Sequence, residues 1–433
     1  MAPMVDLAQE LRRSLRHVRV HPAEDVTRRS EAECEPRAAG LTQDDVDAIW
    51  RSVVRFYRQG LHPAIGICVR RGGRVVLDRT IGHLRGNGPH DPEDVPKEIA
   101  TPGTLFNLFS AAKSVTSMLV HLLDERNLLR LDDAVVEFIP EFGRHGKEWI
   151  TIRHILTHRA GIPVVPDAKV DLELLADPGR ILDLLCDAQP VSPPGRRLAY
   201  HAITGGFILG EVVRRVTGRD VQTFLKDEVL DPCGFTDLRY GARPEDFPRV
   251  AVNAFTGLTP VFPVSWLLRR ALGADVRDVV EISNDRRFLT ALIPSGNVLC
   301  TAEQACRFFQ LLLDDGAIDG VRAFAPATVR RAVAEQTYFT FDFTMWLPLG
   351  YGMGFMLGHD WASLYGPRAP HAFGHIGFTN VLVWADPDRD IAVALLNSGK
   401  PMINPELIWW YDLTRVIAAR CAGGSDTTAR GGR

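Results

Sequence analysis

The sequence has little surplus charge and no apolar run of the length that crosses a membrane, and we expect no secretory leader at its start. Its 50 basic and 53 acidic residues leave a formal net charge of -3, which favours neither nucleic acid nor an anionic membrane as a partner. Residues 1–20 mix charged and apolar side chains and lack the apolar core of about 7–15 residues that defines a signal peptide. We therefore expect a cytoplasmic protein that binds neither nucleic acid nor membranes.

Cysteine is sparse, and no Cys-x-x-Cys pair or Cys/His cluster occurs at the spacing of a zinc site. The chain also lacks a Gly-x-Ser-x-Gly elbow, a His-Glu-x-x-His motif, a Walker-type phosphate loop and a dinucleotide-binding fingerprint. We therefore expect reduced thiols, no metal and no organic cofactor. The seven cysteines are Cys34, Cys68, Cys186, Cys233, Cys300, Cys306 and Cys421.

Two β-hairpins are predicted near opposite ends of the chain. Residues 64–81 contain two β-rich runs around Gly72-Gly73, and glycine supplies the positive φ that a tight hairpin turn requires. Residues 381–396 repeat this pattern around the turn at Asp386-Pro387-Asp388. The long stretch between the hairpins is dominated by helical periods. The second hairpin is therefore expected to join the first in one sheet.

This order of elements predicts an α+β fold, in which N- and C-terminal strands form one antiparallel sheet flanked by helices, with an inserted and mainly helical lobe. The domain is expected to begin where Thr42, with Asp45 three residues on, caps an amphipathic helix. The predicted divisions are a charged, partly helical N-terminal extension (1–40), the domain (41–421) with an α/β lobe (41–120 and 290–421) and a helical lobe (121–289), and a disordered tail (422–433).

Ser110 and Lys113 stand three residues apart at the start of a predicted helix, so they share one face. A serine hydroxyl needs a base to become a nucleophile at neutral pH, and a lysine of lowered pKa can be that base. The helix N-terminus also favours the negative charge that develops during acyl transfer. Ser-x-x-Lys alone is a weak signal, because a surface lysine beside a capping serine gives the same pattern.

Two further candidates are Tyr200, which precedes an apolar helix, and the segment of His375 and Gly377, which enters the last hairpin. A tyrosine before a helix can direct its phenol into a cleft, and a glycine lets a strand approach a ligand closely. Taken singly, the tyrosine ring is as consistent with the core, and the histidine with a loop.

In this order, the three candidates resemble the motifs of a superfamily of serine hydrolases that includes class C β-lactamases, D-stereospecific peptidases and family VIII carboxylesterases. Further segments look like characteristic stretches of that superfamily, so the resemblance extends roughly from Leu41 to Ala418. The motifs are Ser110-Ala-Ala-Lys113, Tyr200-His-Ala202 and His375-Ile-Gly377, and the further segments are Ile152–Pro163, Pro294–Leu313 and Leu349–Phe355.

The resemblance implies a fold of the β-lactamase and transpeptidase type and a mechanism through an acyl-enzyme. Ser110 attacks an acyl carbonyl, and Lys113 and Tyr200 move its proton to the leaving group. Backbone N–H groups of Ser110 and Phe378 form the oxyanion hole. The expected partner is a small-molecule ester or acyl donor, and the oligomeric state is not predicted.

The chain departs from the β-lactamases of this fold at two positions. Ala202 replaces an asparagine amide, and His375 replaces a lysine, while His375 and Gly377 remain the expected substrate-binding residues. A neutral imidazole is a weaker anchor than an ammonium group for a substrate carboxylate. The middle aromatics could line an apolar acyl or alcohol pocket, although each of them is more often a core residue. These are Phe255, Phe262, Trp266 and the run from Tyr338 to Trp346.

The leading hypothesis is a carboxylesterase that acts on small or medium acyl esters. An acyltransferase of secondary metabolism would use the same chemistry but exclude water while an alcohol or amine enters. β-Lactamase or D-peptidase activity is disfavoured by Ala202 and His375. A non-catalytic relative of the same fold is disfavoured because Ser110, Lys113 and Tyr200 are all present.

Overall fold

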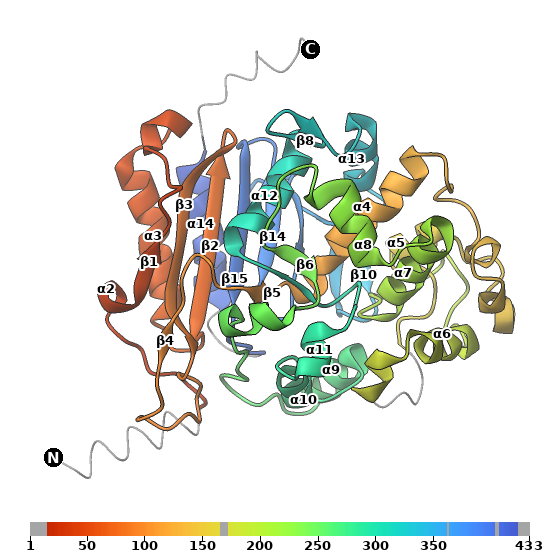
Figure 1. The fold of residues 1–433 in the computed structure, drawn as a ribbon, viewed down its shortest axis with the longest axis horizontal. Coiled ribbons are helices and arrows are strands. Elements are labelled where there is room, and N and C mark those ends of the chain that lie inside the picture. The colour runs from red at the N-terminus through yellow and green to blue at the C-terminus, as the bar shows by residue number, and fades with distance from the viewer. Residues whose placement is uncertain (1–14, 165–171, 362, 403–406, 423–433) are drawn as a thin grey trace.

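Strands from both ends of the chain lie side by side in one antiparallel sheet at the centre of the fold (Figure 1). The computed structural model describes residues 15–164, 172–361, 363–402 and 407–422. In sheet order the strands are β1 Thr27–Arg29, β3 Arg74–Arg85, β2 Ala64–Arg71, β15 Ile391–Asn397, β14 Leu382–Asp386, β13 Phe373–Ile376, β12 Met356–Leu357, β11 Leu347–Tyr351 and β10 Thr337–Asp342, and β4 Glu98–Ile99 pairs with β3.

Both predicted hairpins are present, and they join as the sequence indicates. β2 and β3 turn at Gly72 and Gly73, which have φ values of 54° and 75°. β14 and β15 form the second hairpin, and β15 pairs with β2 from Ile391↔Arg71 to Asn397↔Ile65. The predicted α+β fold, in which N- and C-terminal strands share one antiparallel sheet, is therefore confirmed.

Helices cover both faces of the sheet. On one face, α3 Gln43–Tyr57 packs against α14 Leu407–Arg420, and the N-cap of α3 is the capping box of Thr42 and Asp45 that the sequence predicts. On the other face, α12 Ala302–Leu313 packs against β2, β14 and β15. Alternating side chains of the strands enter two separate apolar cores, one on each face.

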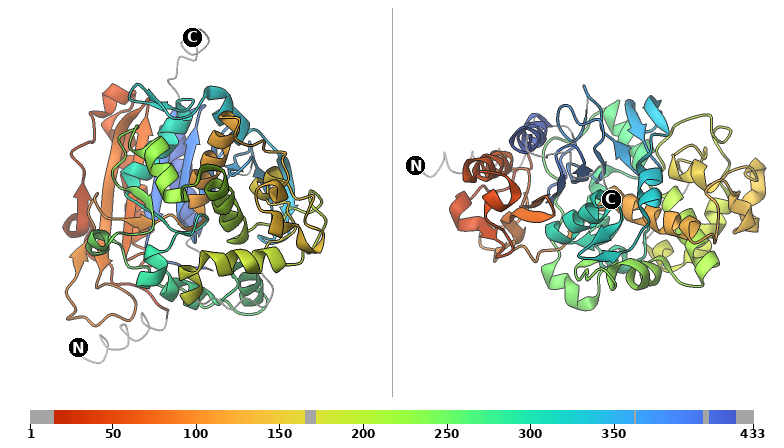
Figure 2. Two further views of the ribbon diagram at one scale, coloured as in Figure 1. Left: turned by 45° about the vertical axis from the view of Figure 1, so that its right-hand side comes forward. Right: turned by 90° about the horizontal axis from the view of Figure 1, so that it is seen from above.

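The mainly helical part of the chain lies on the side of the sheet away from α3 (Figure 2). Its central helix, α4 Ala112–Glu125, packs against α7 Thr204–Thr217, α8 Val221–Leu225 and α13 Pro326–Val333. The remaining α-helices are α2 Ala23–Val26, α5 Ile152–Leu156, α6 Pro178–Asp187, α9 Val264–Leu272, α10 Val276–Ile282 and α11 Arg286–Thr290. One small sheet contains β5 Phe106–Asn107, β7 Val298–Cys300 and β6 Leu238–Tyr240, and another contains β8 Ala317–Ile318 and β9 Val321–Arg322.

The described part of the N-terminal segment packs onto the sheet. β1 adds to the edge of β3 through the pairs Thr27↔Ile81 to Arg29↔Arg79, and Val18 and Val26 are buried. The boundary predicted at residue 41 therefore does not coincide with a break in the sheet. Residues 1–14 of the predicted extension and 423–433 of the predicted tail lie outside the described residues. Across the described ranges, no helix combines the length and apolar character that crossing a membrane demands.

Candidate active site

Ser110 lies in a single 3-10 turn, Phe109–Ala111, which leads directly into α4. The preceding strand β5 is fixed by its pairing with β7, and the N–H of Leu108 donates to the carbonyl of Val298 at 2.9 Å. Phe109 then adopts a φ of +49°, which is unusual for any residue other than glycine. This sharp change of direction places Ser110 at the N-terminal end of α4, as the sequence predicts.

Lys113 is buried beside Ser110, with its Nζ 3.2 Å from the serine Oγ. The same Nζ donates to the carbonyl oxygens of Ala202 at 2.7 Å and Ser295 at 3.2 Å. Burial lowers the pKa of Lys113 to about 7. A neutral amine has two N–H groups and one lone pair, so two carbonyl contacts leave the lone pair for the proton of Ser110.

Tyr200 lies over Lys113, with the Nζ 4.8 Å from the centre of its ring. Its backbone N–H donates to the buried carboxylate of Asp342 at 3.1 Å. Its hydroxyl is buried, and among the described residues it has no hydrogen-bond partner within normal distance. Burial raises the pKa of Tyr200 above its ordinary value, while the neighbouring Ser110 hydroxyl lowers it. The tyrosine is therefore a neutral O–H group beside the serine.

His375 lies within β13, and Gly377 directly follows the end of this strand. His375 is only 1% exposed and is not among the residues that line the adjoining cavity, and its Nδ1 donates to the carbonyl of Ile376 at 2.7 Å. Burial and the charge of Lys113 lower the pKa of His375 to about 3, so the ring is neutral. Gly377 lies in the cavity wall, and a Cβ there would be 2.4 Å from the carbonyl oxygen of Leu108. The close approach of the two segments therefore requires glycine.

Phe378 follows this glycine and lies against the turn that carries Ser110. The rings of Phe109 and Phe378 are 5.5 Å apart, and both residues line the cavity. The segment of Phe378 therefore lies beside the turn that carries Ser110, and a role of their backbone N–H groups in an oxyanion hole stays a prediction.

Two residues near Tyr200 carried no functional prediction from the sequence. The ring of His158 is 4.6 Å from the ring of Tyr200, and its Nδ1 accepts the backbone N–H of His201 at 3.2 Å. Asp342 accepts backbone N–H groups of Tyr200, Thr344 and Met345. Burial lowers the pKa of His158 well below its usual value, so it adds no positive charge near Lys113. His158 falls in one of the superfamily segments, which was its only signal.

A cavity of about 480 Å³ opens at Ser110. No charged side chain lines it among the described residues, and most of the wall is aliphatic. The middle aromatics, for which the sequence left both a pocket wall and the core open, are not among the residues that form its described wall. Phe262 and Trp266 are 80% and 48% exposed. Apolar wall residues from the helical lobe are Val164, Leu174, Leu175, Ile181, Leu184, Leu185, Phe207, Leu268, Val279, Ile282 and Phe288, and others are Ile293, Met402 and Leu407.

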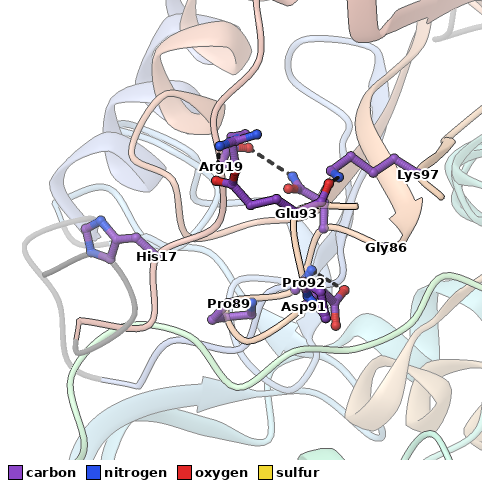
Figure 3. A pocket seen from close by; sticks show the side chains of 10 residues that line it. His17, Arg19, Gly86, Pro89, Asp91, Pro92, Glu93 and Lys97 are labelled. Carbon is purple, nitrogen blue, oxygen red and sulfur yellow. Dashed lines mark hydrogen bonds and ion pairs between the residues drawn. The ribbon is translucent and has the colours of Figure 1, made fainter. Parts of the chain in front are cut away.

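A smaller hollow of about 40 Å³ lies between residues 17–19 and the loop at 86–97 (Figure 3). It is polar, but its cations have partners: Arg19 pairs with Glu93, and Lys97 donates to the carbonyl of Glu93 at 2.7 Å. It contains no nucleophile with a neighbouring base. In the part of the chain that the structure describes, no three His, Cys, Asp or Glu side chains are grouped to hold a metal ion.

Comparison with known proteins agrees with this geometry. The β-lactamase family matches residues 51–414. The esterase/β-lactamase LipL of Mycobacterium tuberculosis is 28% identical over 338 residues, which cover 72% of this chain and 75% of that protein. Penicillin-binding protein 4 of Amycolatopsis lactamdurans is 28% identical over 339 residues, which cover 75% of this chain and 78% of that protein.

Solved structures give the same assignment. A penicillin-binding protein homologue from Caulobacter crescentus superimposes with a TM-score of 0.74 at 26% identity, covering 88% of this chain and 99% of that one. A family VIII carboxylesterase has the same fold, with a TM-score of 0.73 at 23% identity, covering 88% of this chain and 99% of that one. The chain therefore belongs to the β-lactamase family and is a serine hydrolase of the β-lactamase and penicillin-binding-protein type.

Proposed function

We propose that this protein is a carboxylesterase that hydrolyses uncharged esters through an acyl-enzyme on Ser110. The observation that carries the proposal is the cavity of about 480 Å³ at Ser110, whose described wall contains no charged side chain. An apolar acyl or alcohol group gains about 0.8 kcal/mol per buried methylene in such a cavity. A carboxylate would lose its hydration there without gaining a cation.

In the acylation step, the lone pair of Lys113 accepts the proton of Ser110, and Oγ attacks the ester carbonyl. The oxygen of the tetrahedral intermediate is stabilised by the backbone N–H groups of Ser110 and Phe378. Tyr200, whose buried hydroxyl lies beside Ser110, passes a proton to the departing alkoxide and recovers one from Lys113. In deacylation, water enters and the same two groups take its proton and return one to Ser110.

The proposal disfavours β-lactams and D-alanyl peptides as substrates, because both carry a carboxylate. The position where related β-lactamases have a lysine is occupied by His375, which is neutral and is not among the residues that line the cavity. Ala202 lies in the wall where an amide would bind an acylamino group. Acyl transfer to an alcohol instead of water remains the second candidate, since an apolar cavity of this size favours an apolar alcohol over water near the acyl-enzyme.

A substrate comparison with the purified protein tests the proposal. We expect p-nitrophenyl butyrate to be hydrolysed with a kcat/KM at least about 100-fold above that of nitrocefin, since a missing or unpaired polar contact discriminates by that order. A fluorophosphonate probe should label Ser110 and not its neighbours Ser114 or Ser117. Peptide mapping of the labelled protein detects which serine carries the probe. Nitrocefin turnover equal to that of the ester, or labelling at Ser114, would contradict the proposal. Adding 1-butanol to the ester assay and measuring butyl butyrate distinguishes transfer from hydrolysis.

A further inference from the structure

We infer that Lys400 is a positioning residue for the oxyanion site: its buried amine fixes the ring of Phe109 and, through that residue, the backbone N–H of Ser110. The inference rests on the function proposed above. Lys400 follows β15 and directly precedes Pro401 and Met402, which line the cavity. Its side chain is fully buried, at 0% exposure, and within the described residues it forms no ion pair with a carboxylate. Burying a lysine that has no counter-ion among the described residues costs free energy. Its place beside the Phe109–Ala111 turn therefore needs a physical reason.

The amine of Lys400 joins the end of β15 to the residue before the nucleophile. Its Nζ donates to the carbonyl oxygen of Asn397 at 2.7 Å and lies 3.3 Å from the side-chain Oδ1 of the same residue. It also lies 4.8 Å from the centre of the Phe109 ring. Whether charged or neutral, the amine has one N–H for the carbonyl and one for the negative face of the ring. Phe109 is therefore tied to the central sheet through Lys400 and Asn397.

Phe109 needs such a tie because its backbone conformation is unfavourable. A φ of +49° in a bulky residue is strained and persists only where the surroundings enforce it. The backbone N–H of Phe109 donates to the Oδ1 of Asn107 at 2.9 Å, which holds one side of the residue. The ring is held between Phe378, 5.5 Å away, and the amine of Lys400.

The peptide plane between Phe109 and Ser110 carries the N–H that would bind the oxyanion. If Phe109 relaxes to an ordinary φ, this peptide plane turns, and the N–H of Ser110 no longer points toward the position of the oxyanion. The Phe378 segment, whose ring packs on Phe109, would shift with it. Misplacement of a reacting group by about 1 Å can cost about 100-fold in rate, although the substrate still enters the cavity. Loss of Lys400 should therefore weaken binding of the transition state more than binding of the substrate.

The test compares Lys400→Met with Lys147→Met in the full chain. Lys147 is a matched control: it is also 0% exposed, its Nζ donates to the carbonyls of Cys186 and Ala188 at 2.7 and 2.6 Å, and it lies 5.3 Å from the centre of the Phe142 ring. For Lys400→Met we expect kcat on p-nitrophenyl butyrate to fall about 10-fold or more, with KM within about twofold. Affinity for a trifluoromethyl ketone, whose adduct carries an oxyanion, should fall by the same factor. Lys147→Met should lose thermal stability without either kinetic change.

A double-variant cycle tests whether Lys400 acts through Phe109. We expect Lys400→Met combined with Phe109→Leu to be no slower than Phe109→Leu alone, because the second change already removes the ring. If Lys400→Met fails to fold, Phe109→Leu alone carries the test and should show the same fall in kcat and in ketone affinity. Wild-type kcat and ketone affinity in the testable variant, or an equal kinetic loss in Lys147→Met, would overturn the inference. Fluorophosphonate labelling of wild-type Ser110 reports separately on the proposed function.

Discussion

The Nζ of Lys113 lies 3.2 Å from the Oγ of Ser110, and its other hydrogen bonds go to the main-chain carbonyl oxygens of Ala202 and Ser295 rather than to a carboxylate. Among the described acidic residues none forms an ion pair with Lys113, so no neighbouring carboxylate among them offsets the loss of hydration of its charged form. Burial therefore lowers its pKa from 10.5 to about 7. Each pKa unit corresponds to about 1.4 kcal/mol of destabilisation of the ammonium form, so burial makes the free amine available near neutral pH, as the mechanism needs.

The first prediction concerns the identity of this base. Lys113→Arg keeps a positive charge but cannot lose it at any working pH, so it cannot accept the proton of Ser110. We expect the acylation rate to fall about 100-fold or more, measured as the p-nitrophenol burst in a stopped-flow assay. Lys226→Arg is the control, since Lys226 is exposed and pairs with Asp231. Acylation of Lys113→Arg at the wild-type rate would exclude Lys113 as the base.

The second prediction is a pH dependence with a defined sign. Because the free base is the active form, kcat/KM for an uncharged ester should rise with pH, pass half its maximum near the Lys113 pKa of about 7, and then level off. His375, with its pKa lowered to about 3, is already neutral over this range and should add no second step. A profile measured from pH 5 to 9 that stays flat, or that falls through pH 7, would contradict the assignment.

The third prediction concerns the proton relay. Tyr200→Phe retains the ring that packs over Lys113 and against His158, but it removes the hydroxyl. We expect kcat to fall about 100-fold for an ethyl ester, whose alkoxide needs a proton to leave. The fall should be smaller for a p-nitrophenyl ester, because p-nitrophenolate leaves without one. An equal loss on both esters would point to a structural effect of the substitution rather than to proton transfer.

Local patterns predicted the elements of the fold better than the contacts of the site. The capping box at Thr42 and the glycine turn at Gly72-Gly73 act within a few residues, so they could be identified from the sequence and are confirmed. The place of the middle aromatics stayed open between a pocket wall and the core, because aromatic composition does not say on which side of an element a ring lies. Phe262 is exposed, while the aliphatic Leu184 and Leu185 of α6 line the cavity.

Other parts of the site depend on contacts between segments far apart in the sequence. Asp342 reaches the backbone of Tyr200 across 142 positions, and Lys400 reaches the Phe109 ring from the far end of the chain. Neither residue belongs to a short motif whose spacing could be read. The positive φ of Phe109 likewise occurs next to the close approach of Leu108 to Gly377. No residue type at position 109 predicts this φ from the sequence.

The last prediction concerns the close approach of Gly377 to Leu108. Gly377 has no positive φ that would demand glycine, so the reason for glycine is space: an added Cβ would lie 2.4 Å from the Leu108 carbonyl oxygen and 2.8 Å from Val381 side-chain atoms. Gly377→Ala must push the Phe378 segment away from the Ser110 turn, at a cost of about 1–3 kcal/mol in unfolding free energy.

Because displacement at the oxyanion site also affects the reaction, we expect kcat on p-nitrophenyl butyrate to fall about 100-fold in Gly377→Ala. Gly103→Ala is the control, since a Cβ at Gly103 meets only the Thr101 hydroxyl oxygen at 3.6 Å, an ordinary contact. Denaturant unfolding and ester hydrolysis, measured on both variants, check the prediction. If Gly377→Ala loses stability but keeps its full kcat, the close approach of the two segments stabilises the fold without forming the oxyanion site, and the role proposed for Phe378 must be given up.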